Sequence, residues 1–228
     1  MDIAGLQKLT LLDYPGKLAC TVFLPGCNLR CPFCHNASLV LPGRQPTLMT
    51  QPQFLEFLEG RKGKLEGVCI TGGEPTLHHD LPELLKAIRS LGFCVKLDTN
   101  GTRPEVLSDL LQQNLLDYVA MDIKNSPAKY TATCGNVDVL GKVQQSVSML
   151  EESGVEHEFR TTVLHPYHTR SDLAAIGQWL SGTKRYFIQQ FVDSGDLLGE
   201  GQPLTPEELQ ALLQAVQPYI PTAALRGV

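Results

Sequence analysis

The sequence has 228 residues, 43% of them hydrophobic, which is enough for a single domain over residues 1–228 with a sizeable core. Its 19 basic and 24 acidic residues give a net charge of −5, which argues against nucleic-acid binding. No apolar run approaches the roughly 20 residues that a membrane span requires. The amino terminus lacks the charged and apolar regions of a signal peptide, so the expected location is the cytoplasm.

The predicted elements alternate between short β-branched runs and longer amphipathic stretches. Six strands are predicted: Leu18–Leu24, Gly67–Thr71, Cys94–Asp98, Tyr118–Ile123, Glu156–Val163 and Arg185–Phe191. Helical patterns cover Thr50–Lys62, Leu81–Leu91, Pro104–Gln113, Val137–Ser153, Ser171–Leu180 and Thr205–Gln217. This alternation implies parallel strands joined by right-handed crossovers. Because six units are too few for a closed eight-fold barrel, we expect an α/β fold, an open partial (βα)6 TIM-like barrel. Its core runs from about residue 17 to 195, before a C-terminal helix.

Three of the seven cysteines, Cys27, Cys31 and Cys34, form a CxxxCxxC motif after the first predicted strand. Thiolates are the usual ligands of iron–sulfur clusters, commonly four per cubane. Three thiolates can hold three irons and leave the fourth open to a small molecule, as a catalytic metal site requires. A structural zinc site is the alternative. It needs four ligands, however, and His35 adjoins Cys34 too closely for easy joint ligation. The scattered cysteines, predicted to be core residues, are Cys20, Cys69, Cys94 and Cys134.

Polar motifs follow the predicted strands at their carboxyl ends, where the chemistry of parallel sheets collects. After the second strand, Gly72 and Gly73 allow the backbone to approach a ligand's ammonium group, and Glu74 could add negative charge. Two glycines alone are equally compatible with a tight strand-to-helix turn.

Charged residues end the next three strands. Asp98 would point into the barrel mouth, where an unpaired carboxylate is costly to explain as structure. Asp122 and Lys124 share one face, so this acid–base pair suits a zwitterionic ligand, although a surface ion pair has the same pattern. Arg160 on the fifth strand could bind a ligand carboxylate bidentately. His165 follows the fifth strand and could contact a ribose or a partner, or lie solvated in a loop.

The cysteine motif, followed one strand later by the Gly-Gly-Glu-Pro segment ending at Pro75, resembles the radical S-adenosylmethionine (SAM) superfamily. The resemblance implies a partial (βα)6 barrel and one [4Fe-4S] cluster whose unique iron binds the amino and carboxylate groups of SAM. In that family an electron from the cluster cleaves SAM to methionine and a 5′-deoxyadenosyl radical.

The resemblance also implies which residues contact SAM. These are Phe33, His35, Gly72, Gly73, Glu74, Asp98, Asn100, Asp122, Lys124 and Arg160. Phe33 would pack on the adenine, and the glycine segment would bind the methionyl amino group. Asp98 would lie near the ligand's charged end or near a monovalent cation.

Further segments are similar to glycyl-radical enzyme activating proteins, and most similar to those of anaerobic ribonucleoside-triphosphate reductase. The segments are Gln7–Lys8, Asp13–Lys17, Cys34–Asn36, Val95–Gly101 and Asp117–Lys124. Formate-lyase activators instead carry Pro-Tyr-His at the sixth strand, where this chain has Gln189, Gln190 and Phe191. The resemblance implies a flavodoxin-like electron donor and a radical made on a glycine of a partner enzyme. The alternatives are another glycyl-radical partner, a small-molecule substrate, or a non-catalytic iron–sulfur or zinc module.

Overall fold

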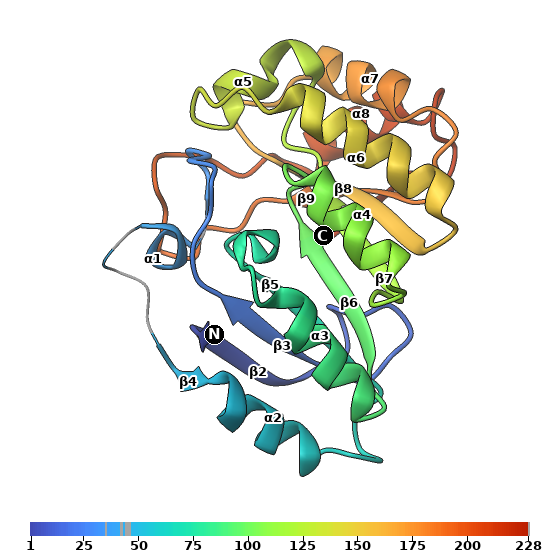
Figure 1. Ribbon diagram of the computed structural model, residues 1–228. Helices are drawn as coiled ribbons and strands as arrows, with labels where there is room; N and C mark the ends of the chain where they lie inside the picture. The colour runs from blue at the N-terminus through green and yellow to red at the C-terminus, as the bar shows by residue number, and fades with distance from the viewer. Residues whose placement is uncertain (35, 42, 44–46, 228) are drawn as a thin grey trace.

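The computed structural model describes residues 1–34, 36–41, 43 and 47–227. Its centre is an eight-stranded sheet in the order β10-β9-β8-β7-β6-β5-β3-β2 (Figure 1). The strands are β2 (Gly5–Thr10), β3 (Ala19–Leu24), β5 (Gly67–Gly72), β6 (Cys94–Thr99), β7 (Tyr118–Asp122), β8 (Glu156–Val163), β9 (Tyr186–Gln190) and β10 (Ala224–Arg226). All neighbours pair in parallel except β2, which runs antiparallel to β3. A separate short pair joins β1 (Asp2–Ile3) to β4 (Met49–Thr50).

The six predicted strands are β3, β5, β6, β7, β8 and β9, and they are adjacent in that order. The mostly parallel, open α/β sheet is therefore confirmed, with strand ends within one residue of those predicted. The edge strands β2 and β10 were not predicted. β2 has three successive exposed residues in place of an apolar run, and β10 is only three residues long.

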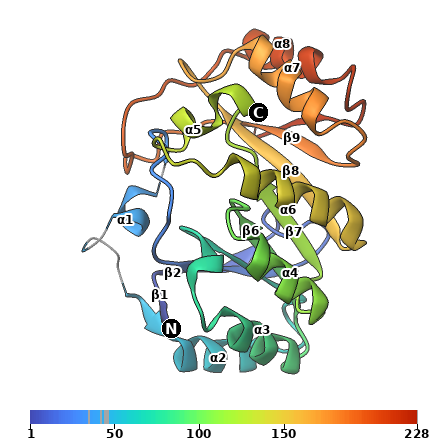
Figure 2. The same ribbon diagram turned by 45° about the horizontal axis from the view of Figure 1, so that its top comes forward.

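The longer helices cover the outer side of the sheet, whereas the short α1 (Ala37–Val40) and α5 (Tyr130–Thr133) lie in the loops after β3 and β7 (Figures 1 and 2). The longer helices are α2 (Gln51–Glu59), α3 (Leu81–Ser90), α4 (Pro104–Gln112), α6 (Leu140–Ser153), α7 (Arg170–Trp179) and α8 (Pro206–Val216). Two short 3-10 turns, Pro75–Leu77 and Pro127–Lys129, follow β5 and β7. Within the described part of the chain, no helix is long and apolar enough to cross a membrane.

Sequence patterns explain the helix positions. The predicted apolar stripe of α3, from Leu81 to Ile88, is fully buried. Helix α8 begins with a capping box in which the Thr205 hydroxyl accepts from the Glu208 backbone N–H at 3.2 Å. Helix α6 begins at Leu140, three residues later than its apolar pattern suggested. These helices bury the side chains on the outer side of the parallel strands, which are mostly apolar, such as Val95, Leu97 and Val119.

The inner side of the sheet carries a buried carboxylate near the amino ends of β7 and β8. Glu158 is completely buried and accepts a hydrogen bond of 2.8 Å from the Tyr118 hydroxyl. Both Nη atoms of Arg226, on the last strand, bind the same carboxylate at 2.5 and 2.9 Å. The guanidinium also lies 3.6 Å from the ring centroid of Phe187. The C-terminal strand thus neutralises a charge inside the barrel.

Candidate active site

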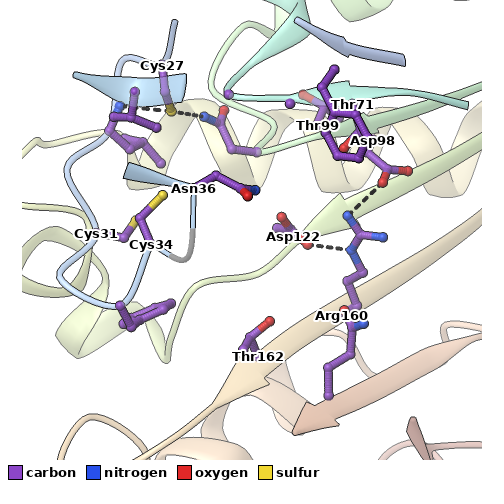
Figure 3. A pocket seen from close by; sticks show the side chains of 18 of the residues that line it. Cys27, Cys31, Cys34, Asn36, Thr71, Asp98, Thr99, Asp122, Arg160 and Thr162 are labelled. Atoms are coloured by element: carbon purple, nitrogen blue, oxygen red, sulfur yellow. Dashed lines mark hydrogen bonds and ion pairs between the residues drawn. The ribbon is translucent and has the colours of Figure 1, made fainter. Parts of the chain in front are cut away.

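A pocket of about 540 Å³ lies at the carboxyl ends of the strands (Figure 3). Its size is typical of a site for a small ligand or cofactor. The loop after β3 forms one side of it, and side chains from β6, β7 and β8 form the opposite side. The pocket therefore lies where parallel sheets place their chemistry.

The three motif cysteines border this pocket. Cys31 is 7% exposed, while Cys27 and Cys34 are half-buried. A hydrogen bond of 3.0 Å from the Cys34 N–H to the Cys31 carbonyl turns the loop, and the two side chains lie next to one another in Figure 3. Cys27 lies nearer to Asn100, whose Nδ2 is 3.9 Å from its Sγ atom.

The arrangement of the three thiols bears on whether the site holds a zinc ion or an iron–sulfur cluster. Among the described residues, no three His, Cys, Asp or Glu side chains converge on a point that could hold one metal ion. A structural zinc ion needs such convergence, whereas each thiolate of a four-iron cluster binds a different iron. Three thiols bordering one pocket are a donor set that fits a [4Fe-4S] cluster. The predicted contact His35 lies outside the described residues.

Both predicted glycines line the pocket, and they also dock the cysteine loop. The N–H of Gly73 donates to the Leu24 carbonyl at 2.9 Å, and the N–H of Glu74 donates to the Gly26 carbonyl at 2.8 Å. A Cβ atom on Gly73 would lie 1.9 Å from that Gly26 oxygen, so any larger residue would push the loop away. Gly72 adopts φ +123°, which other residues rarely adopt.

Glu74 has a different environment from the one expected. Its carboxylate is fully buried and is not among the residues that line the pocket. It accepts hydrogen bonds from the backbone and hydroxyl of Thr76, from the Thr99 hydroxyl at 2.8 Å and from the Asn100 N–H at 2.6 Å. Burial raises the pKa of Glu74, although these donors oppose the shift. Glu74 therefore braces the loops after β5 and β6.

The predicted charged residues meet in one chain of ion pairs, drawn in part in Figure 3. Lys96, which was not predicted, pairs with Oδ1 of Asp98, whose Oδ2 accepts from Nη2 of Arg160 at 3.0 Å. The Nε of Arg160 donates to Asp122 at 2.5 Å, and the other oxygen of Asp122 is 3.0 Å from Nζ of Lys124. The ion-pair chain thus contains three cations and two carboxylates; Asp98, Asp122, Lys124 and Arg160 line the pocket, whereas Lys96 is buried behind them.

This chain of charges stays ionised. Burial alone would raise the pKa of Asp98 and Asp122, but the neighbouring cations hold both below the ordinary value. Asp122 in turn raises the pKa of Lys124 and of Arg160 against the opposing effect of burial. A monovalent cation near Asp98 would lie against these guanidinium and ammonium charges, whereas a ligand carboxylate would be attracted to them.

Phe33 joins the cysteine loop to the segment after β8. Its ring is 4% exposed, borders the pocket and lies 5.5 Å from the Tyr167 ring and 5.8 Å from the His168 ring. His168 is buried, and its Nε2 atom is 2.9 Å from the Lys124 carbonyl oxygen. His168 therefore holds the backbone of a predicted ligand contact, while His165 lies at the surface, outside the pocket lining.

The sequence did not predict one side of the pocket, which is formed by residues of β2, of β3 and of the turn between them. Gln7, Asp13 and Thr21 line the pocket, and the Thr21 hydroxyl donates to Asp13 at 2.5 Å. Recognising the antiparallel edge strand β2 would have pointed to this side of the pocket. Gln189 and Gln190, whose roles were left open, also line the pocket.

Comparisons with known proteins identify the family and the fold. The radical SAM superfamily model matches residues 21–180. A curated protein of Methanocaldococcus jannaschii, provisionally named a glycyl-radical enzyme activating enzyme, is 32% identical over 99% of this chain and 96% of its own.

Solved structures share the fold. A domain of pyruvate-formate lyase-activating enzyme from Bacteroides vulgatus has a TM-score of 0.58 at 19% identity, covering 71% of this chain and 99% of that one. The anSMEcpe structure with bound S-adenosylmethionine has a TM-score of 0.66 at 18% identity, covering 86% of this chain and 57% of that one. With a family match over more than half of its length, the chain belongs to the radical SAM superfamily.

Proposed function

We propose that this protein is an activating enzyme that uses SAM to generate a glycyl radical on a partner, anaerobic ribonucleoside-triphosphate reductase. The observation that carries the proposal is one pocket with three thiols on one side and the ion-paired Asp98, Asp122, Lys124 and Arg160 on the other. Similarity to a relative provisionally named for this activity extends over almost the full length of both chains, which supports the branch.

Membership of the superfamily implies a [4Fe-4S] cluster and SAM, which together supply one-electron cleavage of the sulfonium to a 5′-deoxyadenosyl radical. In our proposal Cys27, Cys31 and Cys34 hold the cluster. Arg160 and Lys124 bind the SAM carboxylate, because both cations line the pocket. The remaining task of the protein is to orient the ligand and to exclude water and oxygen.

In the proposed reaction, the glycine that loses a hydrogen atom belongs to the partner enzyme. The sheet is open, since β2 and β10 are its two edges and do not pair with each other. We propose that a glycine-bearing segment of the partner reaches the pocket through this side of the barrel. A flavodoxin-like protein is the proposed electron donor.

The proposal is tested under strict anaerobic conditions. Reconstituted protein is mixed with dithionite, SAM and the reductase. The expected products are 5′-deoxyadenosine and a glycyl radical, which is detected as a doublet in the EPR spectrum. Cys34→Ser should abolish both products. The matched control is Cys94→Ser, because Cys94 begins β6 at the opposite end of the strands from the pocket.

The outcomes separate the alternatives. A doublet with another glycyl-radical enzyme but none with the reductase would replace the proposed partner and leave the chemistry intact. Cleavage of SAM without a doublet on any such partner would favour a small-molecule substrate. Absence of both cleavage and a reduced-cluster signal in iron-loaded protein would refute the proposal.

A further inference from the structure

The segment from Asp193 to Glu200, which follows β9, crosses the carboxyl ends of the strands to the cysteine loop. The loop begins after β3, which is separated from β9 in the sheet by four other strands. Figures 1 and 2 both show the orange-to-red segment extending to α1. Ser194 from this segment lines the pocket together with Cys34 and Asn36.

The contacts between the two segments centre on Asp196. Its Oδ2 atom accepts hydrogen bonds from the Ser38 backbone N–H at 2.9 Å and from the Ser38 hydroxyl at 2.7 Å. Its carbonyl oxygen accepts from the Ala37 N–H at 3.0 Å. Two residues later, the Leu198 N–H donates to the carbonyl of Cys34 itself at 3.2 Å. Among the described residues, these four hydrogen bonds join the segment to Cys34, Ala37 and Ser38.

The rest of the segment is shaped so that it can lie flat on the loop. The Gly195 N–H donates to the Asp193 carboxylate at 2.7 Å, and Gly195 has φ +76°, so the turn before Asp196 is set within the segment. At its far end, a Cβ atom on Gly199 would lie 3.1 Å from the Pro32 carbonyl oxygen. The segment thus closely approaches Pro32, Cys34, Ala37 and Ser38.

We propose that residues 193–200 form a strap at the carboxyl ends of the strands, and that Asp196 is a positioning residue that holds the cysteine loop closed. The functional meaning of this inference rests on the proposed role of Cys34 as a cluster ligand. Hydrogen bonds to an ionised carboxylate are stronger than neutral ones. Without them the loop should open locally more often, and a thiol reacts or loses its metal mainly from the open form.

The test uses iron-free, reduced protein, so that it does not depend on SAM, on a partner or on cluster activity. Alkylation of each cysteine by iodoacetamide is followed by mass spectrometry. We expect Asp196→Ala to raise the rate at Cys34 by about tenfold or more relative to Cys94, which equals about 1.4 kcal/mol of loop stability. Cys94 is a half-buried reference far from the strap.

Two further variants sharpen the comparison. Asp196→Asn keeps an oxygen acceptor but loses the charge, so its effect should be intermediate. Glu200→Gln removes one negative charge from the exposed end of the same strap and should leave the ratio unchanged. In anaerobically iron-loaded protein, the rate of iron release to a chelator should follow the same order of variants.

The completely buried Cys20 reports global unfolding. If Asp196→Ala leaves Cys20 protected and the ratio of Cys34 to Cys94 alkylation unchanged, the proposal is wrong. If Cys20 becomes reactive, Asp196→Ala has unfolded the protein and the test uses Ser38→Ala instead. This variant removes only the hydroxyl that donates to Asp196. We expect a rise of about threefold there, and an unchanged ratio would refute the proposal.

Discussion

Removing the guanidinium of Arg226 should destabilise the whole fold, although this residue lies two positions from the end of the chain. Glu158 has no exposed surface, and three hydrogen bonds reach its carboxylate, two of them from Arg226 and one from Tyr118. Arg226→Met keeps much of the apolar contact with Phe187 but leaves a buried carboxylate with the tyrosine hydroxyl alone.

The size of the effect follows from the environment of the pair. Breaking a buried ion pair by removing one partner costs about 3–5 kcal/mol. The Arg226 side chain is 32% exposed, so water can reach the vacated position, and the expected loss is about 2–3 kcal/mol. For a chain of this length that corresponds to a fall in Tm of roughly 4–12 °C.

The loss should depend on pH. Burial alone would raise the pKa of Glu158, but Arg226 holds it below the ordinary value. This contribution to stability is present above the unfolded pKa, about 4.3, and is lost as pH falls through the folded one. In Arg226→Met the carboxyl becomes hard to ionise, so the difference from the natural protein should be large near pH 7.5 and smaller near about pH 5.5.

Thermal unfolding at the two pH values measures this difference. The control is the double variant Glu158→Gln with Arg226→Met, in which no buried charge remains, and it should recover most of the loss. A change in Tm below about 2 °C, or an equal change at both pH values, would refute the assignment of Arg226 as the counter-charge of Glu158.

Three other predictions concern the site. Gly73→Ala should lower the iron bound after reconstitution, because its Cβ would meet the Gly26 carbonyl at 1.9 Å; Gly141→Ala, which meets nothing within 4 Å, should not. Burial lowers the pKa of His168, whose ring nitrogens already have backbone partners. Stability should therefore fall as pH drops below about 6.5, and denaturant unfolding of His168→Gln should show a weaker fall; equal slopes would contradict this. Arg160→Gln should weaken SAM binding to the reconstituted protein by about tenfold or more, and an unchanged Kd would argue against its proposed contact.

Local patterns in the sequence were sufficient for the six central strands and for the thiols. The side chains of these strands that face the helices are mostly apolar and buried, and the amphipathic stretches between the strands favour parallel pairing. The spacing of Cys27, Cys31 and Cys34 places three thiols on one short loop whatever surrounds it. The position of Asp98, Asp122 and Arg160 at one end of the sheet follows from the same parallel order.

Contacts between distant segments required the tertiary structure. No local pattern marks Lys96 as the partner of Asp98 from within the barrel, or shows that the donors around Glu74 come from the next strand. Asp196 and Ser38 are 158 residues apart, and their contact depends on how the segment after β9 crosses the barrel. A sequence determines which side chains can ionise or donate, because that is covalent chemistry. The register and curvature of the sheet decide which of them meet, because those depend on all the strands at once.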